Sequence, residues 1–171
     1  MGIMKRLLKI IDGISEWSGK LFGYLLWPGI AILLYEVTAR YLFNAPTIWG
    51  HGMTQRVFAA YYFICGAYIT LTRSHIQMDL IYTRFSARTR AILDIVAFLF
   101  FFAFCGVLLW YGSRYAWSSF MHLEPDNTPF RAPLYPVKLM IPLGTLLIML
   151  QEFAQLWRKL YYAITGKKYE H

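Results

Sequence analysis

Three arginines and one glutamate lie where apolar segments of the sequence begin or end. They are the residues best suited to form ion pairs or to bind an anionic group. Glu36 and Arg40 are four positions apart with the acid first, so on a helix they can form an ion pair. Arg56 opens the second apolar segment and Arg114 closes the third, which places both at the same boundary as Arg40. In the sequence, only Glu36 is close enough to balance these cations.

The surplus positive charge has two interpretations. Charged side chains at membrane depth are costly and usually have a partner, so the arginines can bind a phospholipid phosphate or an acidic residue of another subunit. Alternatively, they are boundary residues whose long side chains reach water. A second acid, Glu152, lies in the inner part of the fourth apolar segment, where a basic residue of the cytoplasmic rim can pair with it.

The sequence predicts no catalytic residue, no metal and no cofactor. The histidines His51, His75, His122 and His171 share neither a helix face nor a membrane depth, so a pair of axial haem ligands is not expected. The sequence also lacks HExxH and CxxC motifs, a glycine-rich phosphate loop and a nucleophile elbow. Nor does it contain the paired broken helices that mark the substrate site of a transporter.

The composition points to a membrane protein. Of the 171 residues, 58% are hydrophobic and 15% are charged, whereas soluble domains have about 25% charged residues. The net charge is +8, but lysines and arginines lie between the apolar segments without a long basic run. This distribution is typical of membrane topology and predicts no nucleic-acid partner. We expect residues 1–171 to form a single transmembrane domain.

Four apolar segments have the length needed to cross a bilayer, at ~1.5 Å per helical residue for a hydrocarbon core of ~30 Å. They are residues 21–43, 53–72, 91–117 and 138–156. We therefore predict an all-α integral membrane four-helix bundle. Pro28-Gly29 in the first segment predicts a bend or a close packing site. Small residues should pack closely against helices of the bundle or of another subunit, at Gly23, Gly29, Gly66 and Ala67.

Two further segments are predicted to lie at the membrane interface. In residues 3–17, apolar side chains recur every three or four positions and charged side chains occupy the other face. This pattern predicts an N-terminal amphipathic helix on the inner leaflet. Alternatively, the same helix extends the first span into the cytoplasm. The linker 73–90 also mixes apolar and basic residues, which is typical of an interfacial element.

The basic residues are divided unequally between the two sides of the predicted bundle. Of the 17 lysines and arginines, 12 fall in the N-terminal segment, the 73–90 linker and the C-terminal tail. Cytoplasmic segments carry the excess of basic residues, so both termini are expected in the cytoplasm. The other five lie toward the opposite side, and they are Arg40, Arg56, Arg114, Arg131 and Lys138.

Several short motifs resemble one family of membrane proteins. The motifs are Arg40-Tyr41-Leu42-Phe43-Asn44-Ala45-Pro46 with Trp49, then Arg56, Gly66, Arg73, His75 and Asp79, and later Pro136-Val137-Lys138-Leu139-Met140-Ile141-Pro142-Leu143-Gly144 and Leu150-Gln151. Over nearly the whole chain, they resemble the small membrane subunit of the tripartite ATP-independent periplasmic (TRAP) transporters. One departure is that glycine follows Trp49, where the family often has an acidic residue. A polar contact with a neighbouring helix is expected to differ here.

The resemblance implies a complex in the bacterial inner membrane. A large (M-type) membrane subunit would move an organic acid by an elevator motion driven by a sodium gradient, and a periplasmic substrate-binding protein would deliver that acid. The small subunit would bind no substrate and would hold the stationary scaffold of the large subunit. Candidates for contact with that subunit or with phospholipid are Glu36, Arg40, Trp49, Arg56, Gly66 and Arg114.

Two other classes of protein remain open at this point. A membrane-anchor subunit of a redox enzyme fits four spans but requires two histidines that ligate haem. A small channel or exporter that works alone also fits the composition.

Overall fold

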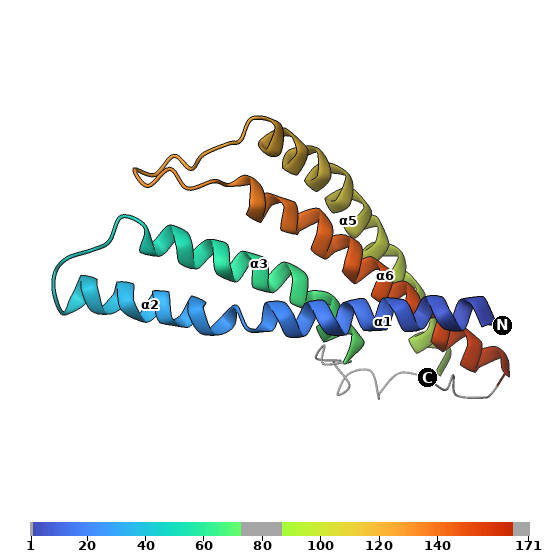
Figure 1. Cartoon of the computed structure of the whole chain (residues 1–171). Coiled ribbons are helices and arrows are strands. Elements are labelled where there is room, and N and C mark those ends of the chain that lie inside the picture. The colour runs from blue at the N-terminus through green and yellow to red at the C-terminus, as the bar shows by residue number, and fades with distance from the viewer. Residues whose placement is uncertain (1, 73–86, 166–171) are drawn as a thin grey trace.

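The computed structural model describes residues 2–72 and 87–165, which are almost entirely helical outside two loops. The helices are α1 (Gly2–Gly23), α2 (Leu26–Tyr41), α3 (Gly50–Leu71), α5 (Ala87–Met121) and α6 (Tyr135–Thr165). Loops 42–49 and 122–134 lie at one end of the bundle, here called the loop end (Figure 1). The start of α1 and the end of α6 lie at the opposite, terminal end. The predicted all-α fold is confirmed.

Three helical stretches of the described chain are long and apolar enough to cross a membrane: Met4–Tyr41, Ile95–Met121 and Tyr135–Arg158. Helix α3 has 22 residues, about 33 Å at ~1.5 Å per residue, but it is less apolar. Its position explains this composition, because α3 contacts α1, α2 and α6 and buries Thr54 and Thr70. The membrane-bundle class is confirmed, while the count of four spans stays a prediction.

Helices α1 and α2 form one nearly straight rod that is interrupted at Tyr24–Leu25 (Figure 1). Pro28 causes the interruption, since its ring has no N–H for the carbonyl of Tyr24 and crowds that carbonyl. The nearby N–H groups donate to carbonyls three residues back, Leu25 to Phe22 at 3.0 Å and Trp27 to Tyr24 at 3.3 Å. The disturbance predicted at the proline therefore lies one turn earlier and leaves the two helices nearly in line.

Helix α1 is amphipathic as predicted, but it turns its apolar stripe outward. Ile10, Ile14 and Trp17 are exposed, whereas Leu8 and Ser15 are buried against the bundle. Apolar side chains face outward in this way where the surroundings are lipid. Because α1 runs in line with α2 and contacts α3 and α6, the arrangement supports the alternative that residues 3–17 extend the first span. A position on the inner leaflet stays a prediction.

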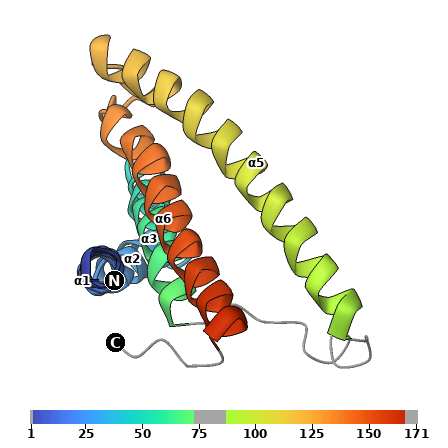
Figure 2. The same ribbon diagram turned by 90° about the vertical axis from the view of Figure 1, so that its right-hand side faces the viewer.

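Helix α5 is the longest helix and the one that diverges most from the others. It contacts α6, and Figure 2 shows the two helices meeting near the loop end and separating toward Ala87. Of the linker 73–90, which we expected to be interfacial, residues 73–86 lie outside the described residues. Residues 87–90 form the first turn of α5.

Glycines allow α3 and α6 to approach each other closely. A Cβ atom on Gly144 of α6 would lie 2.3 Å from the backbone oxygen of Phe63 on α3. A Cβ atom on Gly66 of α3 would lie 2.5 Å from Cδ1 of Ile148 on α6. Both distances are too short for a real contact, so glycine is required at each position unless a neighbour moves.

The other small residues divide into two groups. Gly29 of α2 is buried against Phe58 of α3, and Ala67 is fully buried. The predicted close packing is thus confirmed inside the bundle for these two residues and for Gly66. Gly23 makes no such contact inside the bundle, because no atom lies within 4 Å of its Cβ position at the end of α1. Packing of Gly23 against another subunit stays a prediction.

We predict that Gly144→Ala destabilises the bundle by about 1–3 kcal/mol, because the added methyl group would overlap the Phe63 backbone. Gly106→Ala on α5 is the matched control, since its Cβ position meets nothing within 4 Å and alanine favours the helix. Thermal unfolding of the detergent-solubilised protein measures both. Equal midpoints for the two variants would contradict the close α3–α6 contact.

Candidate functional site

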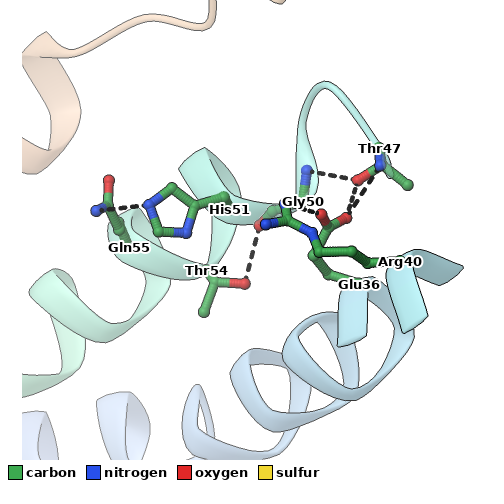
Figure 3. A network of polar contacts seen from close by, with 7 residues as sticks. All are labelled: Glu36, Arg40, Thr47, Gly50, His51, Thr54 and Gln55. Carbon is green, nitrogen blue, oxygen red and sulfur yellow. Dashed lines mark hydrogen bonds and ion pairs between the residues drawn. The ribbon is translucent and has the colours of Figure 1, made fainter. Parts of the chain in front are cut away.

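The carboxylate of Glu36 joins the end of α2 to the start of α3 at the loop end (Figure 3). Its Oε1 accepts a hydrogen bond from Arg40 Nη2 at 2.6 Å. Its Oε2 accepts one from the Thr47 hydroxyl and one from the Thr47 N–H at 3.3 Å. The Glu36 side chain is only 7% exposed, so these bonds replace water around a buried charge. The predicted Glu36–Arg40 pair is confirmed.

The same network holds the first turn of α3. The Gly50 N–H donates to Thr47 Oγ1 at 3.0 Å, and a Cβ atom on Gly50 would lie 2.5 Å from Glu36 Oε2. Glycine after Trp49 therefore lets the carboxylate of Glu36 approach the positive end of the α3 dipole.

Arg56 has its own partner, which sequence reasoning missed. Its Nη2 donates to Asp126 Oδ2 at 2.6 Å, and the two side chains are 12% and 20% exposed. Asp126 belongs to loop 122–134 and also accepts a hydrogen bond from Thr128 Oγ1 at 3.0 Å. The expectation that only Glu36 balances three arginines is wrong, because Asp126, in the loop between the last two helices, reaches Arg56 on α3.

A second ion pair fastens the same loop to α6. Lys138 Nζ donates to Glu124 Oε2 at 2.5 Å and lies 4.0 Å from the centre of the Tyr115 ring on α5. Asp126 N–H also donates to the carbonyl of Ala132 at 2.9 Å across the loop. One signal in the sequence could have revealed these pairs, since the two acids of loop 122–134 lie on the same predicted side as the unpaired cations.

The six candidate residues do not form one site. Trp49 stacks on Tyr35 with ring centres 5.9 Å apart, beside Glu36 and Arg40. Gly66 lies inside the bundle, away from the loop end. Arg114 is exposed on α5, and Arg40 is 49% exposed despite its ion pair. Two of the candidate residues, Arg40 and Arg114, therefore present exposed guanidinium groups at separate places, and Arg131 of loop 122–134 is a further exposed arginine at the loop end.

Another polar cluster, also missed by sequence reasoning, joins α1 to α6 toward the terminal end. Gln151 is fully buried; its Oε1 accepts a hydrogen bond from Ser15 Oγ at 2.9 Å, and its Nε2 donates to Asp12 Oδ1 at 3.0 Å. Arg158 donates to the other oxygen of Asp12 at 2.5 Å. The cluster satisfies polar groups that lipid would leave unpaired, and it holds α1 on the bundle.

The histidines of the described chain contact protein groups. A ring nitrogen of His51 lies 3.1 Å from Gln55 Nε2, and His122 Nδ1 lies 2.7 Å from the Ser118 carbonyl oxygen. Within residues 2–72 and 87–165, no group of three His, Cys, Asp or Glu side chains is arranged to hold a metal ion.

We predict that the Arg56–Asp126 pair stabilises the fold at neutral pH but not in acid. The hydrogen bond from Arg56 keeps the pKa of Asp126 below its usual value. A carboxyl whose pKa is lower in the folded state stabilises that state above its unfolded pKa, and this contribution disappears as the pH falls through the folded pKa. Asp126→Asn should thus lower the unfolding midpoint at pH 7. The difference in midpoint from wild type should shrink as the pH falls below about 4, the ordinary pKa of aspartate, and disappear only below the lower folded pKa of Asp126.

The control for this measurement is Glu16→Gln. Glu16 pairs with Lys20 on the exposed face of α1, and exposed pairs contribute little. If the unfolding midpoints of wild type and Asp126→Asn differ by the same amount from pH 7 to about pH 3, the pair does not titrate as described.

Among curated proteins, none matches this sequence significantly. Among protein families, residues 29–161 match the family described as "Tripartite ATP-independent periplasmic transporters, DctQ component". The match runs from the first turns of α2 into the last turns of α6 and includes both ion pairs that fasten loop 122–134. The chain belongs to the DctQ component family and is the small membrane component of a tripartite ATP-independent periplasmic transporter.

Proposed function

We propose that this chain is a non-catalytic scaffold subunit of a sodium-coupled transporter for organic acids. The family match over residues 29–161 carries the proposal, because it identifies a small component of a transporter with further components. Those components would be a large membrane subunit with an elevator motion and a periplasmic substrate-binding protein. The coupling ion, the class of substrate and the scaffold role follow from the resemblance to the family.

The way the helices are fastened supports a scaffold role. Glu36 joins α2 to α3, and Asp126 fastens loop 122–134 to α3 through Arg56. At the other end, Asp12 joins α1 to α6 through Gln151 and Arg158. A stationary subunit has to keep its shape while another subunit moves across the bilayer, and cross-links at both ends oppose sliding of the helices.

The outward surface supports a partner within the membrane. Large apolar side chains are exposed on several helices, and examples are Trp27, Leu34, Phe100, Phe104 and Trp110. At the loop end, we propose that the exposed guanidinium groups of Arg40 and Arg114 contact phospholipid headgroups or carboxylates of the large subunit. The Arg56 charge is used within the chain, where it pairs with Asp126.

For the orientation, we propose the bacterial inner membrane with both termini in the cytoplasm. A cysteine in place of Asn127, in loop 122–134, should react with a membrane-impermeant maleimide in intact spheroplasts. A cysteine in place of Lys5 should react only after permeabilisation. The native Cys65 and Cys105 are buried, so the wild-type chain gives the background level of labelling. Labelling of the Lys5→Cys variant from outside would overturn this orientation.

The helper role is tested by reconstitution in liposomes. We expect uptake of an organic acid only when the large subunit, this chain and the binding protein are all present, and only with an inward sodium gradient. Replacing sodium by potassium is the control for coupling. Uptake by this chain alone would contradict the proposal, as would full activity of the large subunit and the binding protein without it.

A further inference from the structure

A groove between α5 and α6 is left open toward the terminal end of the bundle. Figure 2 shows α5 leaving α6 progressively from the loop end toward Ala87. The groove encloses about 540 Å³. Its walls are mainly apolar, with Ile95, Phe98 and Phe101 on α5 and Leu156 on α6 among the lining residues. Its polar groups, Glu152 and Gln155, come from α6.

Glu152 is the charged group of this groove. No hydrogen bond or ion pair joins it to another side chain of the described chain. Arg158, which lies further along α6, is already held by Asp12 at 2.5 Å. A carboxylate at this depth is costly without a partner, and charges inside membranes usually face another protein group or a water-filled cavity.

The shape of the groove fits a helix. Ile95, Phe98 and Phe101 recur every three residues on α5, and Glu152 and Leu156 are four residues apart on α6, so each wall is one face of a helix. A segment inserted between two such walls within lipid must satisfy its own backbone hydrogen bonds, and a helix does so.

We propose that this groove receives a membrane-spanning helix of the large subunit, which places a lysine or arginine beside Glu152. The inference rests on the proposed function for the existence of that subunit. A phospholipid is disfavoured, because its acyl chain offers no donor to the carboxylate and Glu152 repels its phosphate. A symmetric second copy is disfavoured as well, because a two-fold contact through this groove brings two Glu152 side chains together.

Photo-cross-linking identifies the occupant in the native membrane. Benzoylphenylalanine in place of Phe98 reports on the groove, and the same residue in place of Leu99, which is 68% exposed, is the neighbouring control. With the large subunit co-expressed, the Phe98 probe should cross-link to a spanning helix of that subunit, next to a lysine or arginine. The Leu99 probe should give this product several-fold less.

Other products of the Phe98 probe would overturn the proposal. These are adducts with lipid only, with a second copy of this chain, or with another segment of the same chain. If the large subunit co-purifies with this chain but the probe gives only such products, the groove assignment fails and the proposed function stands. If the large subunit does not co-purify with the wild-type chain, both fail.

The charge is tested by affinity purification on this chain. Glu152→Lys should lower the recovered large subunit by about tenfold or more, since it places two cations together in an interface. Glu152→Gln should lower it less, and Glu16→Gln, on the exposed face of α1, should leave it unchanged. Replacing the cross-linked lysine or arginine by glutamate should restore binding of the Glu152→Lys chain. If Glu152→Lys recovers as much of the large subunit as the wild-type chain does, the proposed ion pair is wrong.

Discussion

Close approach of helix backbones around α3 is the constraint on which the rest of this structure depends. Lipid is as apolar as leucine, so apolar side chains gain little by turning inward, and association relies on packing and hydrogen bonds. Gly144 and Gly66 bring α6 against α3, while Gly29 brings α2 against it from another side. The stripe of α1 that includes Ile10 is left to face outward. The core is therefore built from small and polar residues, and this explains why α3, which lies within it, is not among the helices apolar enough to count as candidate spans.

Buried polar groups complete the assembly that the glycines begin. Once helices are close, each buried polar group must be satisfied by protein, because the surroundings supply no water. Glu36 does this at the loop end with Thr47 and Arg40, and Gln151 does it between α1 and α6 with Ser15 and Asp12. Close packing and polar contacts at both ends oppose sliding of the helices, which is the property that the proposed scaffold role requires.

Helix α5 differs from this pattern, and the difference bears on function. It contacts α6, and its first half diverges from the bundle (Figure 2). Gly106 on α5 has nothing near its Cβ position, whereas Gly112, nearer the loop end, meets Ile141. The open half of α5 and the charge of Glu152 lie at the same place. The proposed helix of the large subunit would cover this surface.

The sequence by itself determined what depends on near neighbours along the chain. Helical periodicity, the interruption caused by Pro28 and the Glu36–Arg40 pair could be predicted, because each depends on residues within about one helical turn. Only the tertiary structure decided that Arg56 pairs with Asp126, 70 residues away, and that Ser15 bonds to Gln151, 136 residues away. It also decided that the apolar stripe of α1 faces outward, since in lipid the same amphipathic pattern permits either face to pack. Long-range partners depend on how helices pack, which periodicity alone leaves undetermined.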